Sequence, residues 1–188
     1  PASLGSNFRV LSNVTIARST GVSLLLSEAT ESLPHSFKFL SEPFGVCPKS
    51  LPNAGYLIRP IPDEIYTDDK MYVPTFALYA SPPGNEVPLL VNLIKNSGKT
   101  ALEYLEENLL VPFARHWLEL VIHQGIIPEP HAQNLLIEFN SEYNFTGCFV
   151  HRDFEGFYFD LLFREKSKLP VPSQLPFINS IQADYKQD

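Results

Sequence analysis

The sequence predicts an α+β fold in which a mixed or antiparallel sheet packs against helices. Short apolar runs with β-branched residues and nearly alternating polarity occupy much of the first 80 residues, which is typical of strands. Apolar residues then recur at helical spacing between residues 100 and 125, and short extended runs follow. A chain of 188 residues is long enough to form one domain with its own core.

The first part of the chain contains several runs of strand character, separated by turn-forming Ser, Gly and Pro. Strands are expected at residues 7–18, 22–27, 36–41 and 55–60. A further apolar run at 72–80 contains Pro74. Because proline donates no hydrogen bond to a sheet ladder, this run is either an edge strand or a short helix. The first 80 residues are therefore predicted to be mainly extended.

A long helical segment follows, and its start is marked by Thr100 and Glu103, which have the spacing of a capping box. We expect Pro112 to kink or divide this helix, because proline removes an intrahelical donor and clashes with the preceding turn. Two histidines of the segment, His116 and His123, are interpreted as structural or solvated side chains rather than ligands.

The last part of the chain is predicted to contain three extended runs and a short helix. The extended runs are 134–139, 145–150 and 157–163, and the helix is expected at 176–183. The two cysteines, Cys47 and Cys148, are about 100 positions apart and form no CxxC pair. We expect both to be buried free thiols, as in a reducing compartment.

The composition argues against two classes of partner. A net charge of −7 disfavours nucleic acid, because a phosphate backbone requires a basic surface. No apolar run approaches the roughly 20 residues needed to cross a bilayer, and no secretory signal is visible at the start. We therefore expect a cytoplasmic protein, or a fragment of one, that has no membrane partner.

Two polar clusters lie at the ends of neighbouring predicted strands. The first, EPHAQN at 129–134, precedes one strand, and the second, HRDFEG at 151–156, follows the next. If the two strands pair, the clusters converge. A nucleophilic hydrolase is disfavoured, because the sequence has no GxSxG motif and neither cysteine has a partner histidine with an orienting group.

The donor types in the clusters suggest either a metal or a nucleotide. Zinc ligands are present, but their spacing matches no structural zinc pattern. A nucleotide site fits better, because Asn134 and Asp153 offer hard oxygen ligands for Mg²⁺, and His131 with Arg152 can meet phosphate charge. Protein kinases hold their metal with an Asn and an Asp one hairpin apart in the same way. The alternative is structural: Asp153 caps a turn, Asn134 bonds a loop, and the histidines are core groups.

The stretch GIIPEPHAQNLLIEF followed by HRDFEG closely resembles the paired motif of the IucA/IucC family, the NRPS-independent siderophore synthetases. In that family a Gly-Ile-x-x-Glu-x-His-x-Gln-Asn stretch precedes an Arg-Asp-x-x-Gly stretch. The resemblance extends backwards through the helical segment, residues 76–80, residues 57–59 and a Glu-x-x-Gly element at 42–45, and so covers most of the chain.

The resemblance implies an ATP-dependent condensation of a polycarboxylic acid, citrate or a relative of it, with an amine or a hydroxyl. In this chemistry the acid becomes an acyl-adenylate and the second substrate displaces AMP; the implied cofactors are ATP and Mg²⁺. The implied architecture is a cupped hand with a kinase-like palm. Residues 1–96 would form a mainly β part facing nucleotide and substrate, and 97–188 would form the helical segment and the motif hairpin.

The resemblance also implies roles for single residues. His131 would contact the α-phosphate and the activated carboxylate, and Asp153 with Asn134 would bind Mg²⁺. Glu129 and Arg152 would orient His131 and the loop, or close a salt bridge. The remaining nucleotide contacts would come from Gln133, Asn134, Arg152, Arg59, Ser19 and Thr20. For Arg59, a structural ion pair with Glu64 or Asp63 is an equal alternative.

One part of the motif set departs from the family. Its Lys-x-Ser-x-Asn and Thr-Ser-x-x-Arg strand corresponds here to RVLSNVTIARSTG. Either Arg18, Ser19 and Thr20 supply the same groups from shifted positions, with Arg18 as a second catalytic residue, or the acid site is altered.

Three functions therefore remain open: the ligase, a kinase-like small-molecule phosphotransferase, and a degenerate family member that does not catalyse. The expected partners are a small carboxylic acid and an amine, and a homodimer of the full-length protein is possible. The family has regions on both sides of this stretch, so we expect this chain alone not to turn over substrate.

Overall fold

The structure, a computed structural model, describes residues 11–51, 54–63, 65, 67, 69–81, 84, 87–171 and 179–180. Its α-helices are α1 (Asn13–Glu28), α2 (Leu89–Ser97), α3 (Ala101–Leu105), α4 (Val111–Gln124) and α5 (Leu161–Lys166). The shorter helical turns are η1 (Thr30–Ser32), η2 (Thr75–Tyr79), η4 (Phe154–Gly156) and the π-helical turn η3 (Glu106–Leu110). The strands are β1 (Phe37–Phe39), β2 (Phe44–Val46), β3 (Tyr56–Ile58), β4 (Lys70–Pro74), β5 (Ile126–Ile127), β6 (Leu135–Asn140), β7 (Phe145–His151), β8 (Tyr158–Phe159) and β9 (Asn179–Ser180).

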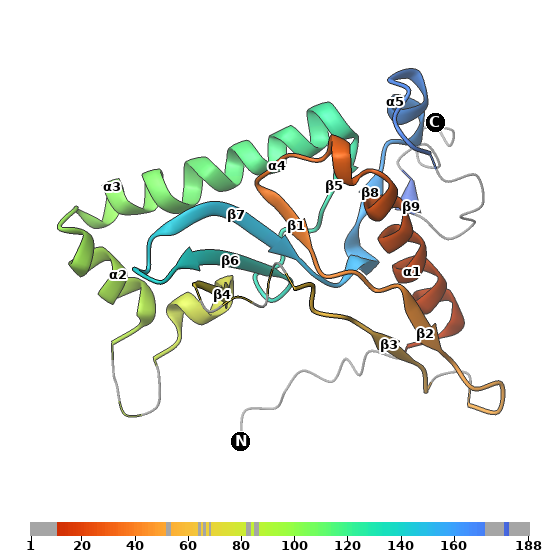
Figure 1. Ribbon diagram of the computed structural model, residues 1–188, viewed down its shortest axis with the longest axis horizontal. Helices are drawn as coiled ribbons and strands as arrows, with labels where there is room; N and C mark the ends of the chain where they lie inside the picture. Colours follow the sequence, from red (N-terminus) through yellow and green to blue (C-terminus); the bar gives the residue numbers. More distant parts are fainter. Residues whose placement is uncertain are drawn as a thin grey trace, which may run out of the picture.

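A four-stranded mixed sheet lies at the centre of the molecule, in the order β1-β7-β6-β4 (Figure 1). Strand β1 runs parallel to β7, and the other neighbours are antiparallel, so the predicted α+β fold with a mixed sheet is confirmed. The strands predicted at 36–41, 134–139 and 145–150 correspond to β1, β6 and β7, and the one at 55–60 to β3, which pairs with β2 in a separate hairpin. Both predicted parts of the chain contribute strands to the central sheet.

The first described helix occupies a stretch that the sequence predicted as strands. Residues 13–28 form α1, and its N-cap Ser12 accepts a hydrogen bond from the Thr15 backbone N–H at 3.3 Å. Its buried side chains Val22, Leu25 and Leu26 recur at helical spacing and belong to the core. The strands predicted at 7–18 and 22–27 are therefore wrong wherever the structure describes them. A short apolar run looks the same in a buried strand and in a buried helix, and packing decides between them.

The predicted long helix is confirmed, and it is divided just before its proline. The Thr100 side chain accepts from the Glu103 backbone N–H, and the Glu103 carboxylate accepts from the Thr100 backbone N–H at 2.9 Å, which completes the capping box. The π-helical turn η3 separates α3 from α4, and Pro112 lies in the first turn of α4. A proline is tolerated there, because the first N–H groups of a helix have no intrahelical acceptor.

Three other predictions change in detail. Only residues 158–159 of the predicted run 157–163 form a strand, because the Asp160 side chain accepts from the Phe163 N–H at 2.8 Å and starts α5. The run at 72–80 was predicted to be an edge strand or a short helix, and it contains one of each. Strand β4 ends at Pro74, and the helical turn η2 follows it. Of the helix predicted at 176–183, only 179–180 are described, and they form β9 beside β8; the rest lies outside the described residues.

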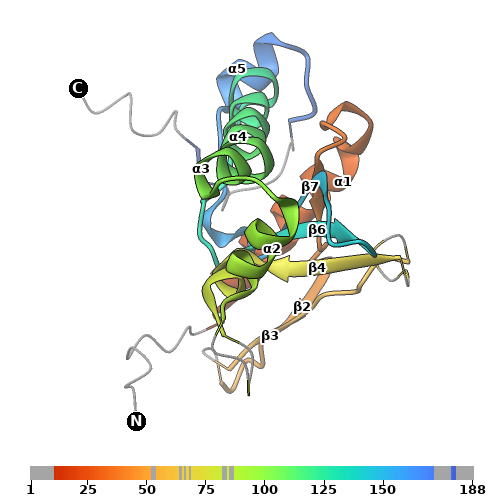
Figure 2. The same ribbon diagram turned by 90° about the vertical axis from the view of Figure 1, so that its left-hand side faces the viewer.

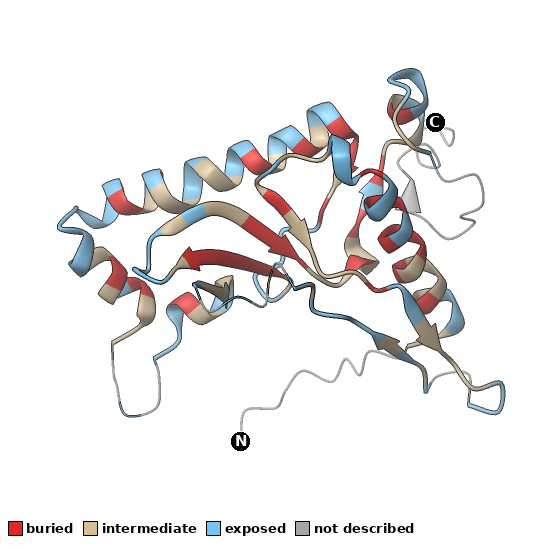
Figure 3. Cartoon of the chain, viewed as in Figure 1, coloured by how far each residue is buried: buried red, intermediate tan, exposed pale blue. Residues whose placement is uncertain are grey.

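Helices α3 and α4 cover one face of the sheet, and Figure 2 shows the β2–β3 hairpin on the other side of it. The core under these helices contains Leu78, Leu90, Leu93, Tyr104, Leu135, Ile137, Phe139 and Phe149. A second cluster joins α1 to the end of α4, η4 and β8. Buried residues accordingly lie along β6, the end of β7 and the inner side of α1 (Figure 3).

A carboxylate in the middle of the sheet connects its four strands. Glu138 on β6 is 2% exposed, and its partners are Lys38 on β1, Tyr72 on β4 at 2.8 Å and Thr146 on β7 at 2.9 Å. Burial acts to raise the pKa of Glu138, but the hydrogen bonds from Lys38, Tyr72 and Thr146 outweigh it, so the pKa is lowered overall.

Both cysteines are free thiols, as predicted, but Cys47 and Cys148 are half-buried rather than buried. Within the described part of the chain, no helix has both the length and the apolar character needed to cross a membrane.

Candidate functional site

The two polar clusters meet at the open end of the β6–β7 hairpin, as the sequence predicted. Leu135 pairs in register with His151, and the Arg152 backbone N–H donates to the Asn134 carbonyl at 3.0 Å. The Arg152 guanidinium also donates to the Gln133 carbonyl, through Nε at 3.0 Å and Nη2 at 2.7 Å. Arg152 therefore fixes the loop of the first cluster against the second.

The loop that contains His131 is held from two further directions. The Thr75 hydroxyl donates to the Ala132 carbonyl at 2.6 Å, and Glu129 lies so close to Gly156 that a Cβ there would collide with its side chain. The His131 ring is exposed, and its Nδ1 accepts from the Gln133 backbone N–H at 3.3 Å. A neutral ring that accepts at Nδ1 carries its proton on Nε2, so His131 can donate from that atom.

A polar cavity of about 310 Å³ opens between α1, the β2–β3 hairpin and the start of η4. Its polar lining consists of Thr15, Ser19, Glu42, Arg59, Asp153 and Glu155. Three of the residues predicted for the site, Ser19, Arg59 and Asp153, thus come together from separate segments of the chain. The hairpin can approach α1 closely because Gly45 has no side chain. A Cβ at this position would lie only 2.6 Å from the Ile16 side chain.

Glu42 also lines this cavity, although sequence reasoning proposed no role for it. Its backbone N–H donates to the Ser23 hydroxyl at 2.6 Å, and its Oε1 forms an ion pair with Arg59. The side chain is 1% exposed, and its Oε2 has no hydrogen-bond partner among the described residues. A buried oxygen left without a partner costs about 1–3 kcal/mol. The Glu-x-x-Gly element directly after a predicted strand was the available signal. Arg59 does form a structural ion pair, but with Glu42; Glu64, one of the two expected partners, lies outside the described residues.

The charge of Arg59 acts on the Arg152 guanidinium beside this cavity. Burial lowers the pKa of Arg152, and the positive charge of Arg59 lowers it further. The Arg59 side chain is 34% exposed, so a ligand can reach it. Both guanidinium groups are already engaged, Arg59 with Glu42 and Arg152 with the Gln133 carbonyl, so a phosphate or a carboxylate bound here would have to share them.

The other predicted site residues lie elsewhere. Residues Arg18, Thr20, His131, Gln133 and Asn134 are not among those that line the cavity. The Thr20 hydroxyl donates to the Ile16 carbonyl at 2.9 Å within α1, and Arg18 is half-buried on the same helix. The structure therefore brings together three of the nine predicted site residues in the cavity. His131, Gln133 and Asn134 belong to the adjoining loop, which Arg152 binds without lining the cavity.

The donor set does not match a zinc site. Nowhere in the described ranges do three or more His, Cys, Asp or Glu side chains form a group that could hold a metal ion, so the zinc interpretation has no support. Asp153 lines the cavity and has a left-handed backbone φ of 66°. A single carboxylate fits Mg²⁺, because this ion is usually held by one or two carboxylates together with the phosphates of a substrate.

The second cluster begins with a histidine that is a core group. His151 Nε2 lies 2.9 Å from His116 Nε2, and His116 Nδ1 lies 3.0 Å from the Ser36 hydroxyl. Burial lowers the pKa of His116 to about 4, and burial together with His116 lowers the pKa of His151 well below its usual value. The structural interpretation is therefore confirmed for His116, and His123 is solvated on α4.

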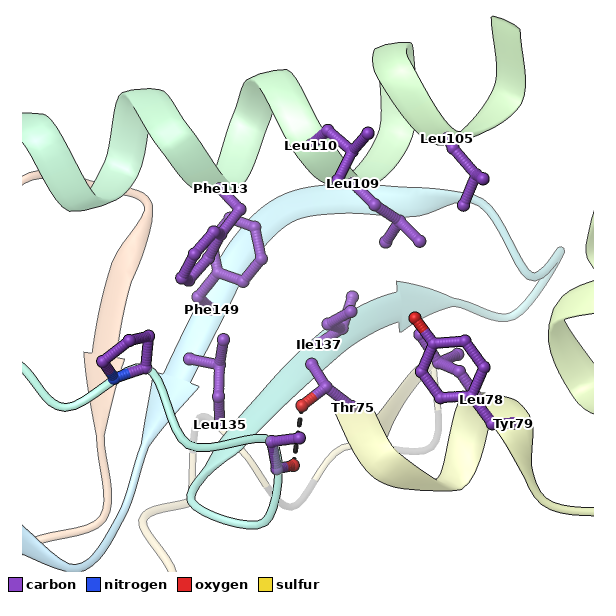
Figure 4. A pocket seen from close by; sticks show the side chains of 12 residues that line it. Thr75, Leu78, Tyr79, Leu105, Leu109, Leu110, Phe113, Leu135, Ile137 and Phe149 are labelled. Atoms are coloured by element: carbon purple, nitrogen blue, oxygen red, sulfur yellow. Dashed lines mark hydrogen bonds between the residues drawn. The ribbon is translucent and has the colours of Figure 1, made fainter. Parts of the chain in front are cut away.

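A second cavity, of about 220 Å³, lies on the helix side of the motif loop (Figure 4). Most of its wall consists of the apolar side chains Leu78, Leu105, Leu109, Leu110, Phe113, Leu135, Ile137 and Phe149. Its polar groups are the hydroxyls of Thr75 and Tyr79, and no charged side chain lines it. This cavity suits an apolar group, so the polar cavity is the better candidate for phosphate chemistry.

The fold is similar to that of proteins of siderophore biosynthesis. Petrobactin biosynthesis protein AsbB from Bacillus anthracis str. Sterne matches with 22% identity and a TM-score of 0.67 over 88% of this chain and 29% of AsbB. Aerobactin synthetase IucC from a hypervirulent pathotype of Klebsiella pneumoniae matches with 18% identity and a TM-score of 0.65 over 93% of this chain and 33% of IucC. ATP-bound aerobactin synthetase IucA from the same source matches with 16% identity and a TM-score of 0.58 over 80% and 30%.

These likenesses confirm the predicted resemblance at the level of the fold. The chain spans about a third of the length of the structures that it matches. No protein-family model matches the sequence, and neither does any curated protein.

Proposed function

We propose that this chain is the nucleotide-binding part of an ATP-dependent ligase of siderophore biosynthesis. The ligase joins a citrate-like polycarboxylic acid to an amine or a hydroxyl in the cytoplasm. The observation that supports this most is the polar cavity beside the motif hairpin, where Ser19, Arg59 and Asp153 come together. The likeness in fold to two aerobactin synthetases, one of them determined with ATP bound, agrees with it.

In this proposal different charged side chains bind different parts of the triphosphate. Arg59 and Arg152 hold phosphate oxygens; the charge of Arg59 lowers the pKa of Arg152, so the two groups act on the same region. Asp153 would hold Mg²⁺, and this ion would supply charge withdrawal from the phosphate oxygens. His131 donates from Nε2 to the α-phosphate, where negative charge increases as the acid attacks.

The reaction then has two steps. An acid carboxylate attacks the α-phosphorus of ATP, the bond to the β-phosphate breaks, and acyl-adenylate and pyrophosphate form. The amine next attacks the acyl carbon, loses a proton, and displaces AMP. The first step needs no amine, so it can be measured by itself.

The test is ATP–pyrophosphate exchange by the full-length protein with citrate and related polyacids. Exchange should depend on the acid and should fall by at least 100-fold in His131→Ala, since a positioned charge-stabilising donor contributes about 10²–10³ in rate. His123→Ala is the matched control, because His123 is exposed on α4. An ADP product would instead indicate the kinase-like phosphotransferase. Absence of nucleotide binding in calorimetry would indicate the degenerate member.

A further inference from the structure

A serine and two buried histidines form a line that ends at the first residue of the second polar cluster. Ser36 precedes β1, His116 lies on α4, and His151 ends β7. The Ser36 hydroxyl lies 3.0 Å from His116 Nδ1, and His116 Nε2 lies 2.9 Å from His151 Nε2. The two histidines are only 1% and 3% exposed. Both nitrogens of the His116 ring are therefore engaged, and the ring connects α4 to the motif hairpin.

The backbone of His151 aligns the two polar clusters with each other. It pairs in register with Leu135 of β6, which directly follows the first cluster, and with Phe39 of β1. Its carbonyl also accepts from the Leu40 backbone N–H at 2.9 Å. The next residue, Arg152, donates to two carbonyls of the first cluster. A displacement of His151 would therefore move one cluster relative to the other.

Asp153 lies in a short segment that is held at both ends. Its backbone φ of 66° is a left-handed conformation, which a residue with a side chain keeps only where its surroundings hold it. On one side, Phe154 is fully buried in the core. On the other side, His151 is buried and bonded to His116. The position at which Asp153 enters the polar cavity thus depends on both anchors.

The contact between the two imidazoles defines a position more narrowly than apolar packing would. Burial of apolar groups has no preferred direction, whereas a hydrogen bond requires its donor and acceptor to face each other at a set distance. A buried polar pair also favours one arrangement, since any other leaves a polar group without a partner. Phe37 and Phe149 enclose the rings, and the His116–His151 contact fixes where β7 ends against α4.

We propose that His116 is a positioning residue for Asp153 and acts through His151. His116 is buried and lines neither of the two cavities described above, so it holds the second cluster in place without touching a ligand. The inference rests on the proposed function for the consequence, which is the affinity for a nucleotide with Mg²⁺. The positioning itself is a property of the protein without any ligand, and it can be measured separately.

The direct test is amide hydrogen exchange in the 188-residue chain without a ligand. The Arg152 backbone N–H donates to the first cluster, so its protection reports whether the clusters are aligned. Asparagine at position 116 can reach Ser36 but not His151, whereas the longer glutamine can reach His151. His116→Asn should therefore lower the protection of the Arg152 amide at least tenfold more than that of the core amide of Leu26, and His116→Gln should restore most of it.

The matched control is Leu120→Ala, which removes a fully buried side chain from the same helix. It should destabilise the core without lowering the protection of Arg152 more than that of Leu26. If His116→Asn does not fold, His116→Phe replaces it, because phenylalanine has no group that can bond to His151. Equal changes at Arg152 and Leu26 in the variant that folds overturn the proposal, and so does a selective loss at Arg152 in Leu120→Ala.

A binding measurement separates this inference from the proposed function. In calorimetry of the full-length protein, His116→Asn should weaken the binding of ATP with Mg²⁺ at least tenfold and the binding of ATP in EDTA by a smaller factor, because Asp153 acts through the ion. His116→Gln should bind both nearly as the wild type does. A wild type that binds no ATP contradicts the proposed function, while hydrogen exchange still decides the positioning. Unchanged affinity for ATP with Mg²⁺ in His116→Asn contradicts the role of His116 alone.

Discussion

Two buried imidazoles in contact make the stability of the molecule depend on pH. His116 and His151 share one Nε2–Nε2 contact of 2.9 Å, and a single proton between them requires one ring to donate and the other to accept. Protonation of either ring would place a charge in the core beside Phe37 and Phe149. The pair is therefore stable only as two neutral rings.

The free energy of unfolding should fall as the pH decreases from about 6.5 towards 4. An unfolded histidine binds a proton below about pH 6.5, whereas folded His116 does so only near its lowered pKa of about 4, so acid favours the unfolded state. Each histidine contributes a slope of up to about 1.4 kcal/mol per pH unit in this window. Urea denaturation at a series of pH values between 7.5 and 5 measures it.

The variant His116→Phe supplies the control for this prediction. It should reduce the slope between pH 6.5 and 5, because one of the two neutral imidazoles is gone, whereas His123→Ala should leave the slope unchanged. A slope that is the same in His116→Phe and in the wild type would show that other groups cause the acid sensitivity.

At the scale of elements, the polar cavity exists because the β2–β3 hairpin packs closely against α1. A Cβ at Gly45 would lie 2.6 Å from Ile16 Cγ2 and 2.8 Å from Leu57 Cδ2, so β2 can approach α1 only without a side chain at this position. The arrangement places Glu42 before β2 and Arg59 after β3 on the same wall of the cavity.

Gly45→Val should force the hairpin away from α1 and destabilise the fold by about 1–3 kcal/mol, the usual cost of overpacking. Urea denaturation measures the change, and Ala54→Val is the control because Ala54 is exposed beside the same hairpin. The expectation fails if Gly45→Val unfolds at the same urea concentration as the control.

At the scale of the whole molecule, the central sheet takes strands from both parts of the chain. Strands β1 and β4 precede residue 96, while β6 and β7, which contain the ends of the motif hairpin, follow it. The carboxylate of Glu138 on β6 also depends on Lys38 and Tyr72 from the first part. The predicted boundary between residues 96 and 97 therefore separates strands that belong to the same sheet.

Residues 97–188 expressed alone should not unfold cooperatively, because β6 and β7 would each lose a neighbouring strand and expose an edge. The complete 188-residue chain should unfold in one transition under the same conditions. Circular dichroism during heating distinguishes the two outcomes, and a sharp transition in the shorter piece would show that it is a domain by itself.

Local signals in the sequence determined the parts of this protein that depend on near neighbours. The capping box at Thr100, the division of the helix near Pro112 and the β6–β7 hairpin with its two polar clusters all rest on residues close in sequence, and the structure contains them. The resemblance in motif likewise led to the fold that the comparisons show.

Tertiary packing alone decided what lies around those parts. Residues 13–28 are helical because Val22, Leu25 and Leu26 fill the core, whereas the short apolar run by itself fits a strand as well as a helix. The buried position of Glu42, its ion pair with Arg59 and the cavity that both share with Asp153 depend on segments up to about 140 positions apart in the chain. The free energy gained by burying a side chain depends on which segments pack around it in the folded molecule. The local sequence therefore shows which chemical groups are present but not where they lie.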